Sequence, residues 1–392
     1  MKSNYKQLGQ YIRQVDVRNV DGKEENLLGV SVQKQFIPSI ANTVGTDFSK
    51  YKVVKKGQFT YIPDTSRRGD KIGIALLEDY EEGLVSNVYT VFEVIDENQL
   101  MPEYLMLWFK RPEFDRYARF KSHGSVREIF GWDEMCKVEL PVPPIEKQRS
   151  IVKAYQTITD RMILKQKINE NLEATAQTIF NEMFAPYYLS TAPIPTGWQQ
   201  KSLSEICQVK GGKRLPSECE FSNIPTQHPY IRIRDMYQGK YVELSEDFQY
   251  IDDSTFSYIQ NYVVSSGDII IAIVGVTAGE ISFVGNSLNN ANLTENCVKL
   301  TNIQDVPAEY IYEFWQFLRQ NGEIKPLLVG AAQPKLPIYN IQSVKVLIPD
   351  EKAILKYRHL VEPISETIKN NIYENRYLAI AQKNLLSQIF SC

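Results

Sequence analysis

The sequence has no long apolar run and few cysteines. Its longest continuous apolar stretch, residues 269–274, is far too short to cross a bilayer. Residues 1–6 (MKSNYK) lack the apolar core of a signal peptide. The five cysteines are scattered and form no CxxC pair, which argues against a zinc ribbon or a disulfide framework. We therefore expect reduced thiols in a cytoplasmic protein without a membrane partner.

The chain also lacks an excess of charge of either sign. Its 392 residues include 44 Lys and Arg against 47 Asp and Glu, for a formal net charge of −3. A protein that simply coats nucleic acid usually has a uniformly basic surface, so this class is disfavoured. A sequence-specific reader can confine its cations to one face, and nucleic-acid recognition therefore stays open.

No catalytic motif of a DNA-acting enzyme is present. There is no GxxxxGK[ST] phosphate loop, no HExxH motif, and no [DNS]PP[YF] tetrapeptide of the kind that holds a target amine in amino-methyltransferases. Glu323 and Lys325 match the end of a metal-dependent nuclease motif, but no Pro-Asp lies in the thirty residues before them. Residues 275–279 (GVTAG) lack the lysine of a phosphate loop and are typical of a turn after a strand. We expect a chain with no catalytic residue, bound cofactor or metal site.

The chain repeats itself once. Residues 104–109 (YLMLWF) resemble residues 310–315 (YIYEFW) at an offset of 206. The same offset continues without a gap into the C-terminal part of each copy, where it pairs Phe184 with Phe390. A fixed period of this kind indicates duplicated structural units.

Upstream of this register, the two copies correspond only with insertions. Residues 53–59 match 263–269 at a displacement of 210, and residues 6–8 match 201–203 at a displacement of 195. Each copy therefore has a globular part of variable length followed by a part of fixed length. Recognition surfaces can diverge in the first part, whereas the second part holds a geometry constant.

The fixed-length parts have the pattern of long helices. Residues 145–184 follow a PVPP segment, contain no Gly or Pro, and place apolar residues mostly three or four positions apart. A helix of about 40 residues is roughly 60 Å long and needs a partner, which residues 351–390 supply. A tethered partner has a high effective concentration, so we favour an intramolecular antiparallel coiled coil over a homodimer. The residues expected to pack in it are Tyr155, Ile158, Met162, Leu172, Ile179, Met183, Val361, Ile364, Ile368, Leu378, Leu385 and Ile389.

The globular parts have the pattern of short strands with helices. Runs of β-branched and aromatic residues predict strands within residues 52–62, 88–94 and 268–274, and short helices are expected at 103–111 and 308–319. The predicted class is α+β. Two similar domains, 1–144 and 186–349, are separated by two long helices, 145–185 and 350–392, in a pseudo-two-fold arrangement.

Three segments and the duplication resemble the specificity subunits of Type I restriction-modification systems. The segments are residues 142–148 (VPPIEKQ), 195–206 (PTGWQQKSLSEI) and 266–269 (SGDI). The resemblance covers essentially the whole chain, and its strength lies in the order of the segments and in the repeat. It implies that the two globular parts are target-recognition domains, each reading one half of a bipartite site in double-stranded DNA.

The same resemblance implies the partners. The helices would set the spacer between the half-sites and dock two modification subunits, which supply S-adenosylmethionine-dependent adenine methylation. Restriction subunits would add ATP- and Mg-dependent translocation and cleavage. The chain itself would be a non-catalytic subunit. The alternative is a duplicated protein-protein scaffold that never touches DNA.

Basic and polar residues in the loops of the globular parts are the candidates for DNA contacts. Arg can bind guanine bidentately, Gln can bind adenine, and Lys more often holds phosphate. Any one of these residues is equally well explained as a solvated surface group, so the prediction concerns the set. The set is Arg67, Arg68, Lys71, Lys121, Ser125 and Arg127 in the first copy, and Lys210, Lys213, Arg214, Arg232, Arg234, Gln333 and Lys335 in the second.

Overall fold

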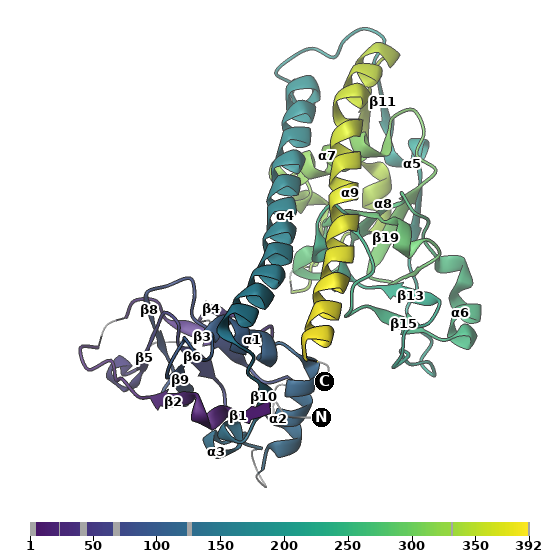
Figure 1. The fold of residues 1–392 in the computed structure, drawn as a ribbon. Coiled ribbons are helices and arrows are strands. Elements are labelled where there is room, and N and C mark those ends of the chain that lie inside the picture. The colour runs from purple at the N-terminus through teal and green to yellow at the C-terminus, as the bar shows by residue number, and fades with distance from the viewer. Residues whose placement is uncertain are drawn as a thin grey trace. The chain divides into compact units, whose positions relative to one another are not determined.

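The structure is a computed structural model that describes residues 5–22, 24–39, 45–65, 71–123, 128–330 and 332–390. The chain divides into two units, which we call unit 1 (Met1–Arg161 with Leu378–Cys392) and unit 2 (Met162–Tyr377). Unit 1 contains the globular part of the first copy, and unit 2 contains that of the second copy (Figure 1).

Each globular part is built from short strands and short helices, in line with the predicted α+β class. The elements of the first copy are β1 Tyr5–Gln7, β2 Ile12–Val15, β3 Leu28–Val30, β4 Phe36–Pro38, β5 Lys52–Lys55, β6 Phe59–Tyr61, β7 Ile74–Leu76, β8 Glu82–Val85, β9 Thr90–Val94, α1 Pro102–Phe109, α2 Pro112–Lys121, α3 Trp132–Cys136 and β10 Glu139–Pro141. Those of the second copy are β11 Gln199–Ser202, α5 Leu203–Ile206, β12 Gln208–Gly211, β13 His228–Ile231, β14 Tyr241–Val242, β15 Gln249–Ile251, α6 Asp253–Ile259, β16 Ile269–Ala272, β17 Ile281–Val284, β18 Asn292–Leu293, β19 Cys297–Thr301, α7 Ala308–Gln320, α8 Ile338–Ser343 and β20 Lys345–Ile348. Short 3₁₀ turns join several of them, and α4 (Ile145–Tyr188) and α9 (Glu351–Phe390) are the long helices.

The main sheets of the two copies have the same strand order. The first copy has the order β2-β9-β6-β7, and the second has β12-β19-β16-β17 with β14 added at one edge. The duplication seen in the sequence is therefore a duplication of topology.

A smaller strand pair gives an independent test of the two sequence displacements. Lys6 of β1 lies opposite Leu140 of β10, and Lys201 of β11 lies opposite Val346 of β20. The first strand of each pair is displaced by 195 residues and the second by 206. Both displacements meet in one strand pair with the same register, which confirms the repeat as read from the sequence.

One tyrosine in each copy joins this strand pair to a short helix. The Tyr104 hydroxyl of α1 donates to the Pro141 carbonyl at 3.0 Å, and the Tyr310 hydroxyl of α7 donates to the Leu347 carbonyl at 2.9 Å. Both donors and both acceptors differ by the offset of 206. Each ring is almost wholly buried, and a buried hydroxyl requires such a partner.

The apolar run at β16 reflects burial on both faces of the sheet. Ile269 and Ile271 belong to the core that contains α7 and the long helices, whereas Ile270 and Ala272 belong to a second core on the opposite face. A strand covered on both sides is apolar at every position instead of alternating. This burial explains the uninterrupted run in the sequence.

The long helices pack against each other through aromatic and aliphatic side chains near their ends. In unit 2, α4 and α9 run side by side (Figure 1), and Phe184 contacts Tyr310 and Tyr357 with ring centroids 5.0 and 5.4 Å apart. In unit 1, Phe390 lies 5.5 Å from Tyr104. Phe390 and Tyr104 are the repeat counterparts of Phe184 and Tyr310, so each copy holds a helix end in the same way.

The two helices are antiparallel, as predicted, but the contacts between their middle portions are polar. Lys165 donates to Asn371 at 2.8 Å and pairs with Glu374 at 2.7 Å, and the Asn371 amide donates to Asn169 at 2.8 Å. Asn169 and Asn371 are both buried. The pairing shows the antiparallel direction. Met162 of α4 accepts from Asn375 of α9, and the later α4 residue Asn169 accepts from the earlier α9 residue Asn371.

The residues predicted to pack between the helices fall into two groups, one inside the hydrophobic clusters and one outside them. Hydrophobic clusters contain Tyr155, Leu172, Ile179, Met183, Val361, Ile364, Ile368, Leu385 and Ile389. Ile158, Met162 and Leu378 are half-buried and belong to none of the clusters of the described residues. They lie in the polar middle portion, so an apolar stripe does not continue along the whole pair.

Helix α4 ends at Tyr188 rather than at residue 185, and it includes Pro186. The Tyr188 hydroxyl accepts from the Leu347 amide at 2.9 Å and lies 3.1 Å from the Tyr310 hydroxyl. These contacts hold the last turn against β20 and α7, which explains why the helix extends past the proline.

We expect Phe184→Ala to lower the free energy of unfolding by about 3–5 kcal/mol, because it removes a fully buried ring from an aromatic cluster. Tyr377→Ala, at a helix position that is 65% exposed, should change it by less than about 0.5 kcal/mol. Urea denaturation followed by circular dichroism measures both. Equal destabilisation by the two variants would contradict this account of the helix end.

Candidate nucleic-acid interface

Each copy carries a small hairpin at the same place in its fold. His123 and Ile129 exchange backbone hydrogen bonds at 3.1 and 3.0 Å, and Val329 and Lys335 do so at 2.8 and 2.9 Å. The two pairs differ by the offset of 206. The loop that was predicted as the counterpart of residues 121–127 is thus closed by the same backbone pairing.

These hairpins attach to the main sheets at equivalent points. Ile129 forms a bridge with Asp64, which follows β6, and Lys335 forms a bridge with Val274, which follows β16. Asp64 and Val274 are related by the displacement of 210. We call the end of each sheet where its hairpin attaches the hairpin end.

In the second copy, three further segments meet at the hairpin end. The Gly212 and Lys213 amides, just after β12, donate to the carbonyls of Cys297 and Leu293 at 3.0 and 2.8 Å. A Cβ atom at Gly212 would lie 2.0 Å from the Thr294 carbonyl oxygen, so only glycine permits this approach. The Thr294 amide donates to the Ile231 carbonyl, which brings the segment that starts at Arg232 to the same end.

Most of the predicted contact residues of the second copy are exposed there. Lys213 lies 5.7 Å from the Tyr262 ring, and Arg214 pairs with Glu295 at 2.7 Å while its side chain stays 79% exposed. Glu295 also holds the pKa of Arg214 above its usual value. The other exposed members of the set are Lys210, on β12, and Arg234, Gln333 and Lys335.

Arg232 differs from these residues because its guanidinium is already bound. Its Nη2 donates to an Asp235 carboxylate oxygen at 2.8 Å and to the Asp247 carbonyl at 2.9 Å. The Asp235 side chain is only 5% exposed, so it needs this cation as a partner. The geometry makes Arg232 a support for the segment that carries Arg234.

In the first copy, four of the predicted residues lie outside the described residues. These are Arg67, Arg68, Ser125 and Arg127. Thr65 and Glu128, which border residues 66–70 and 124–127, are joined because the Thr65 amide donates to the Glu128 carbonyl at 2.9 Å. Lys71 is exposed, and the neighbouring Ile72 amide donates to the Asp115 carboxylate at 3.0 Å.

Asp115 belongs to a buried ion pair that supports this region of the first copy. Lys34 Nζ lies 2.5 Å from an Asp115 carboxylate oxygen, and both side chains are nearly inaccessible. Burial lowers the pKa of Lys34, although the Asp115 carboxylate opposes that shift. The pair thus joins the loop after β3 to α2 and to the start of the chain segment at Lys71.

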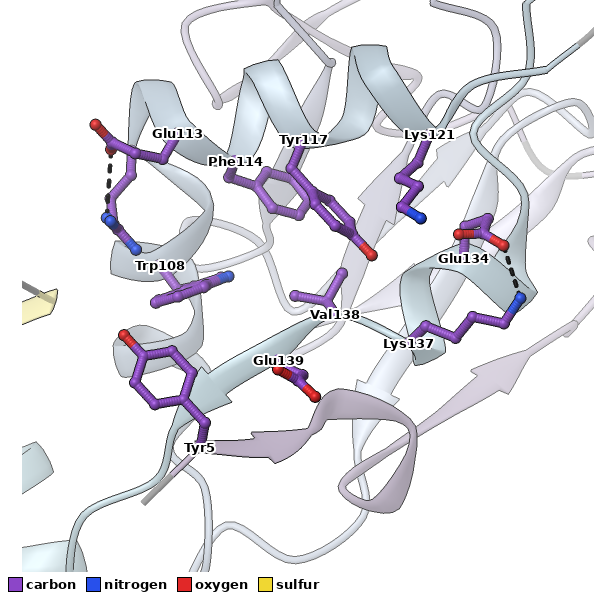
Figure 2. Close-up of a pocket in the computed structure, with 11 residues that line it drawn as sticks. Tyr5, Trp108, Glu113, Phe114, Tyr117, Lys121, Glu134, Lys137, Val138 and Glu139 are labelled. Carbon is purple, nitrogen blue, oxygen red and sulfur yellow. Dashed lines mark hydrogen bonds and ion pairs between the residues drawn. The ribbon is translucent and has the colours of Figure 1, made fainter. Parts of the chain in front are cut away.

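Lys121 lies beside a pocket of about 460 Å³. Figure 2 shows its ammonium group near Tyr117 and Glu134, with Trp108 and Tyr5 across the cavity. Lys137 pairs with Glu134 at 2.7 Å on the same wall. This Lys121 therefore faces a mixed aromatic and charged pocket in addition to preceding the hairpin.

One exposed residue at the hairpin end was missed by the sequence reasoning. Residues 275–279 form a turn after β16, as predicted, and Val276 at its tip is 99% exposed. The signal was present in the sequence as a β-branched residue in a glycine-bounded turn.

The described residues of this candidate interface lack the donor set of a metal centre. Among the described residues, no group of three His, Cys, Asp or Glu side chains could hold a metal ion. His228 stacks on Phe256 and lies 2.9 Å from Asp253. No helix in the described part of the chain is both long enough and apolar enough to span a membrane. What the hairpin end offers is cations, amides and apolar tips.

Comparisons with known proteins agree with this arrangement. A family model described as the type I restriction modification DNA specificity domain matches residues 4–174 and again residues 195–374. Each match covers one globular part and most of its long helix. This family concerns DNA specificity and not catalysis, in agreement with the prediction of a non-catalytic chain.

Two curated relatives and one solved structure are similar along the chain. The chain is 25% identical to the specificity subunit of the type I restriction enzyme MjaIX of Methanocaldococcus jannaschii, over 71% of this chain and 66% of that protein. It is 20% identical to the HindI specificity subunit of Haemophilus influenzae, over 87% of each chain. The crystal structure of a Type-I restriction-modification system S subunit from M. genitalium has a TM-score of 0.54, with 14% identity over 99% of this chain and 96% of that one, and thus the same fold. The chain belongs to the type I restriction-modification DNA specificity family and carries two of its specificity domains in tandem.

Proposed function

We propose that this chain is the DNA-reading subunit of a type I restriction-modification complex. Each specificity domain reads one half of a bipartite site in double-stranded DNA. Helices α4 and α9 set the spacer between the half-sites and dock two modification subunits. Those subunits supply S-adenosylmethionine-dependent adenine methylation, and restriction subunits add ATP- and Mg-dependent translocation and cleavage. We expect the complex in the cytoplasm.

One observation carries this proposal: the two copies have the same backbone framework but different side chains on it. The strand order and the hairpin register are the same in both copies. At the attachment point, however, Asp64 and Ile129 are replaced by Val274 and Lys335. Equal backbones with unequal side chains suit the reading of two different base sequences, because bases are distinguished by side-chain contacts.

The direct test is methylation-sensitive sequencing of the host genome with and without this chain. We expect a methylated motif of two half-sites with a fixed spacer in the parent strain, and we expect its loss when the chain is deleted. Duplex-binding assays with the chain alone and with its modification subunits distinguish a DNA-reading subunit from a protein scaffold that does not bind DNA. A motif unaffected by the deletion, together with no DNA binding in the complex, would favour that scaffold.

The two neighbouring arginines of the second copy should behave differently. Arg234→Ala should weaken binding to the target duplex by roughly tenfold more than binding to random duplex, and leave stability unchanged, because the side chain is exposed. Arg232→Ala should lower the free energy of unfolding by about 2–3 kcal/mol, because Asp235 loses its partner. Competition binding and urea denaturation give the two readouts. Equal loss on target and random duplex would reduce Arg234 to a phosphate contact.

Lys335 should contribute an electrostatic contact to the phosphate backbone. Lys335→Ala is expected to reduce the slope of log affinity against log salt by about 1, since one fewer counterion is released on binding. Lys352→Ala, on the exposed first turn of α9, is the matched control and should leave the slope unchanged. Titrations at several salt concentrations measure both. The same slope for Lys335→Ala and the unchanged protein would remove Lys335 from the interface.

A further inference from the structure

Val276 is an apolar side chain with almost no contacts of its own. It is 99% exposed, at the tip of the turn that follows β16. A single exposed valine is common on protein surfaces, so exposure alone decides nothing. Two further properties, the rigidity of its turn and its neighbours, distinguish this one.

Backbone and side-chain hydrogen bonds stabilise the turn. The Gly279 amide donates to the Ala272 carbonyl at 2.8 Å, and the Glu280 amide donates to the Thr277 carbonyl at 2.9 Å. The Trp315 indole donates to the Gly279 carbonyl at 2.8 Å from the buried side. Gly275 and Gly279 have φ angles of 80° and 96°, which residues other than glycine rarely adopt. These hydrogen bonds restrain the backbone of the tip, and a restrained backbone lowers the entropic cost of binding through it.

The turn is joined directly to the hairpin that carries predicted contact residues. The Gly275 amide donates to the Pro334 carbonyl at 2.8 Å, and Val274 forms a bridge with Lys335. Pro334 stands between Gln333 and Lys335, both of which are exposed. An apolar tip thus lies beside an amide that can bind adenine and a cation that can bind phosphate.

The major groove of DNA offers one apolar group for such a tip. Among the four unmodified bases, only thymine displays a methyl group there, at C5, among hydrogen-bond donors and acceptors. We propose that Val276 contacts the C5 methyl group of a thymine in the half-site read by the second specificity domain. This inference rests on the proposed function and adds one base to the target of this domain.

The first copy has no apolar residue at the corresponding sequence position. The displacement of 210 relates Val276 to Ser66, which is followed by Arg67 and Arg68. The two half-sites should therefore differ in their dependence on a thymine methyl group. Removal of that methyl group should affect the half-site of the second domain through Val276.

The test replaces each thymine of the target duplex, one at a time, with deoxyuridine, which lacks only the C5 methyl group. The unchanged chain in complex with its modification subunits should lose about fourfold in affinity at one position of one half-site. The Val276→Ala complex should bind the unmodified target about fourfold more weakly and show no further loss at that position. Competition binding against the unmodified duplex measures each effect.

Val20→Ala is the matched control, because Val20 is an exposed valine of the first copy, outside the specificity domain that carries Val276. It should retain the deoxyuridine loss of the unchanged chain. Thermal melting should be the same for the Val276→Ala chain and the unchanged chain, since the side chain is exposed. A deoxyuridine loss that persists in Val276→Ala, or no loss at any thymine, overturns this inference alone. No preference of the unchanged complex for the target over a scrambled duplex contradicts the proposed function and this inference with it.

Discussion

The packing of a phenylalanine at a helix end against a buried tyrosine is the contact on which each half of this protein depends. Phe184 lies against Tyr310, and Phe390 lies against Tyr104. The same tyrosines donate to the strand carbonyls of Leu347 and Pro141. One side chain therefore ties a short helix, a strand pair and a long helix together. Because the contact occurs in both copies, any change in it would alter how a specificity domain is held on the helices.

The middle portions of the long helices are held together by side-chain hydrogen bonds and not by apolar packing. Buried amides at Asn169 and Asn371 satisfy each other and Lys165, and a buried polar group is costly unless such partners are present. Apolar contacts tolerate small slides along a helix, whereas hydrogen bonds between side chains require matched positions. The ends of the pair thus contribute mainly burial, and the polar stretch contributes mainly selectivity for one alignment.

At the hairpin end, the two copies share a backbone framework and differ in their side chains. Backbone pairing at His123 and Val329 is conserved between the copies in geometry, and the side chains there are unrelated. The second copy adds an ion-paired support at Arg232 and Asp235, and it adds β14 to the sheet. A framework held by backbone hydrogen bonds and a buried core leaves the loop side chains free to differ. This separation explains how one duplicated fold can present two different surfaces.

The sequence by itself determined the duplication, the α+β class and the two antiparallel helices. A repeat register and a helical period can both be read directly from the order of residues. The offset of 206 holds without a gap from residue 104 of the first copy to residue 390 of the second. Sequence alone did not reveal that Arg232 is bound to Asp235 while Arg234 is exposed, because the charge of a residue does not identify its partner. It also did not reveal the polar middle of the helix pair, where Ile158, Met162 and Leu378 follow the apolar pattern outside the hydrophobic clusters. For Val276 the sequence shows a β-branched residue in a glycine-bounded turn, but neither its exposure nor the hairpin beside it. These features arise from contacts between residues far apart in the chain, and only the tertiary structure specifies which distant groups meet.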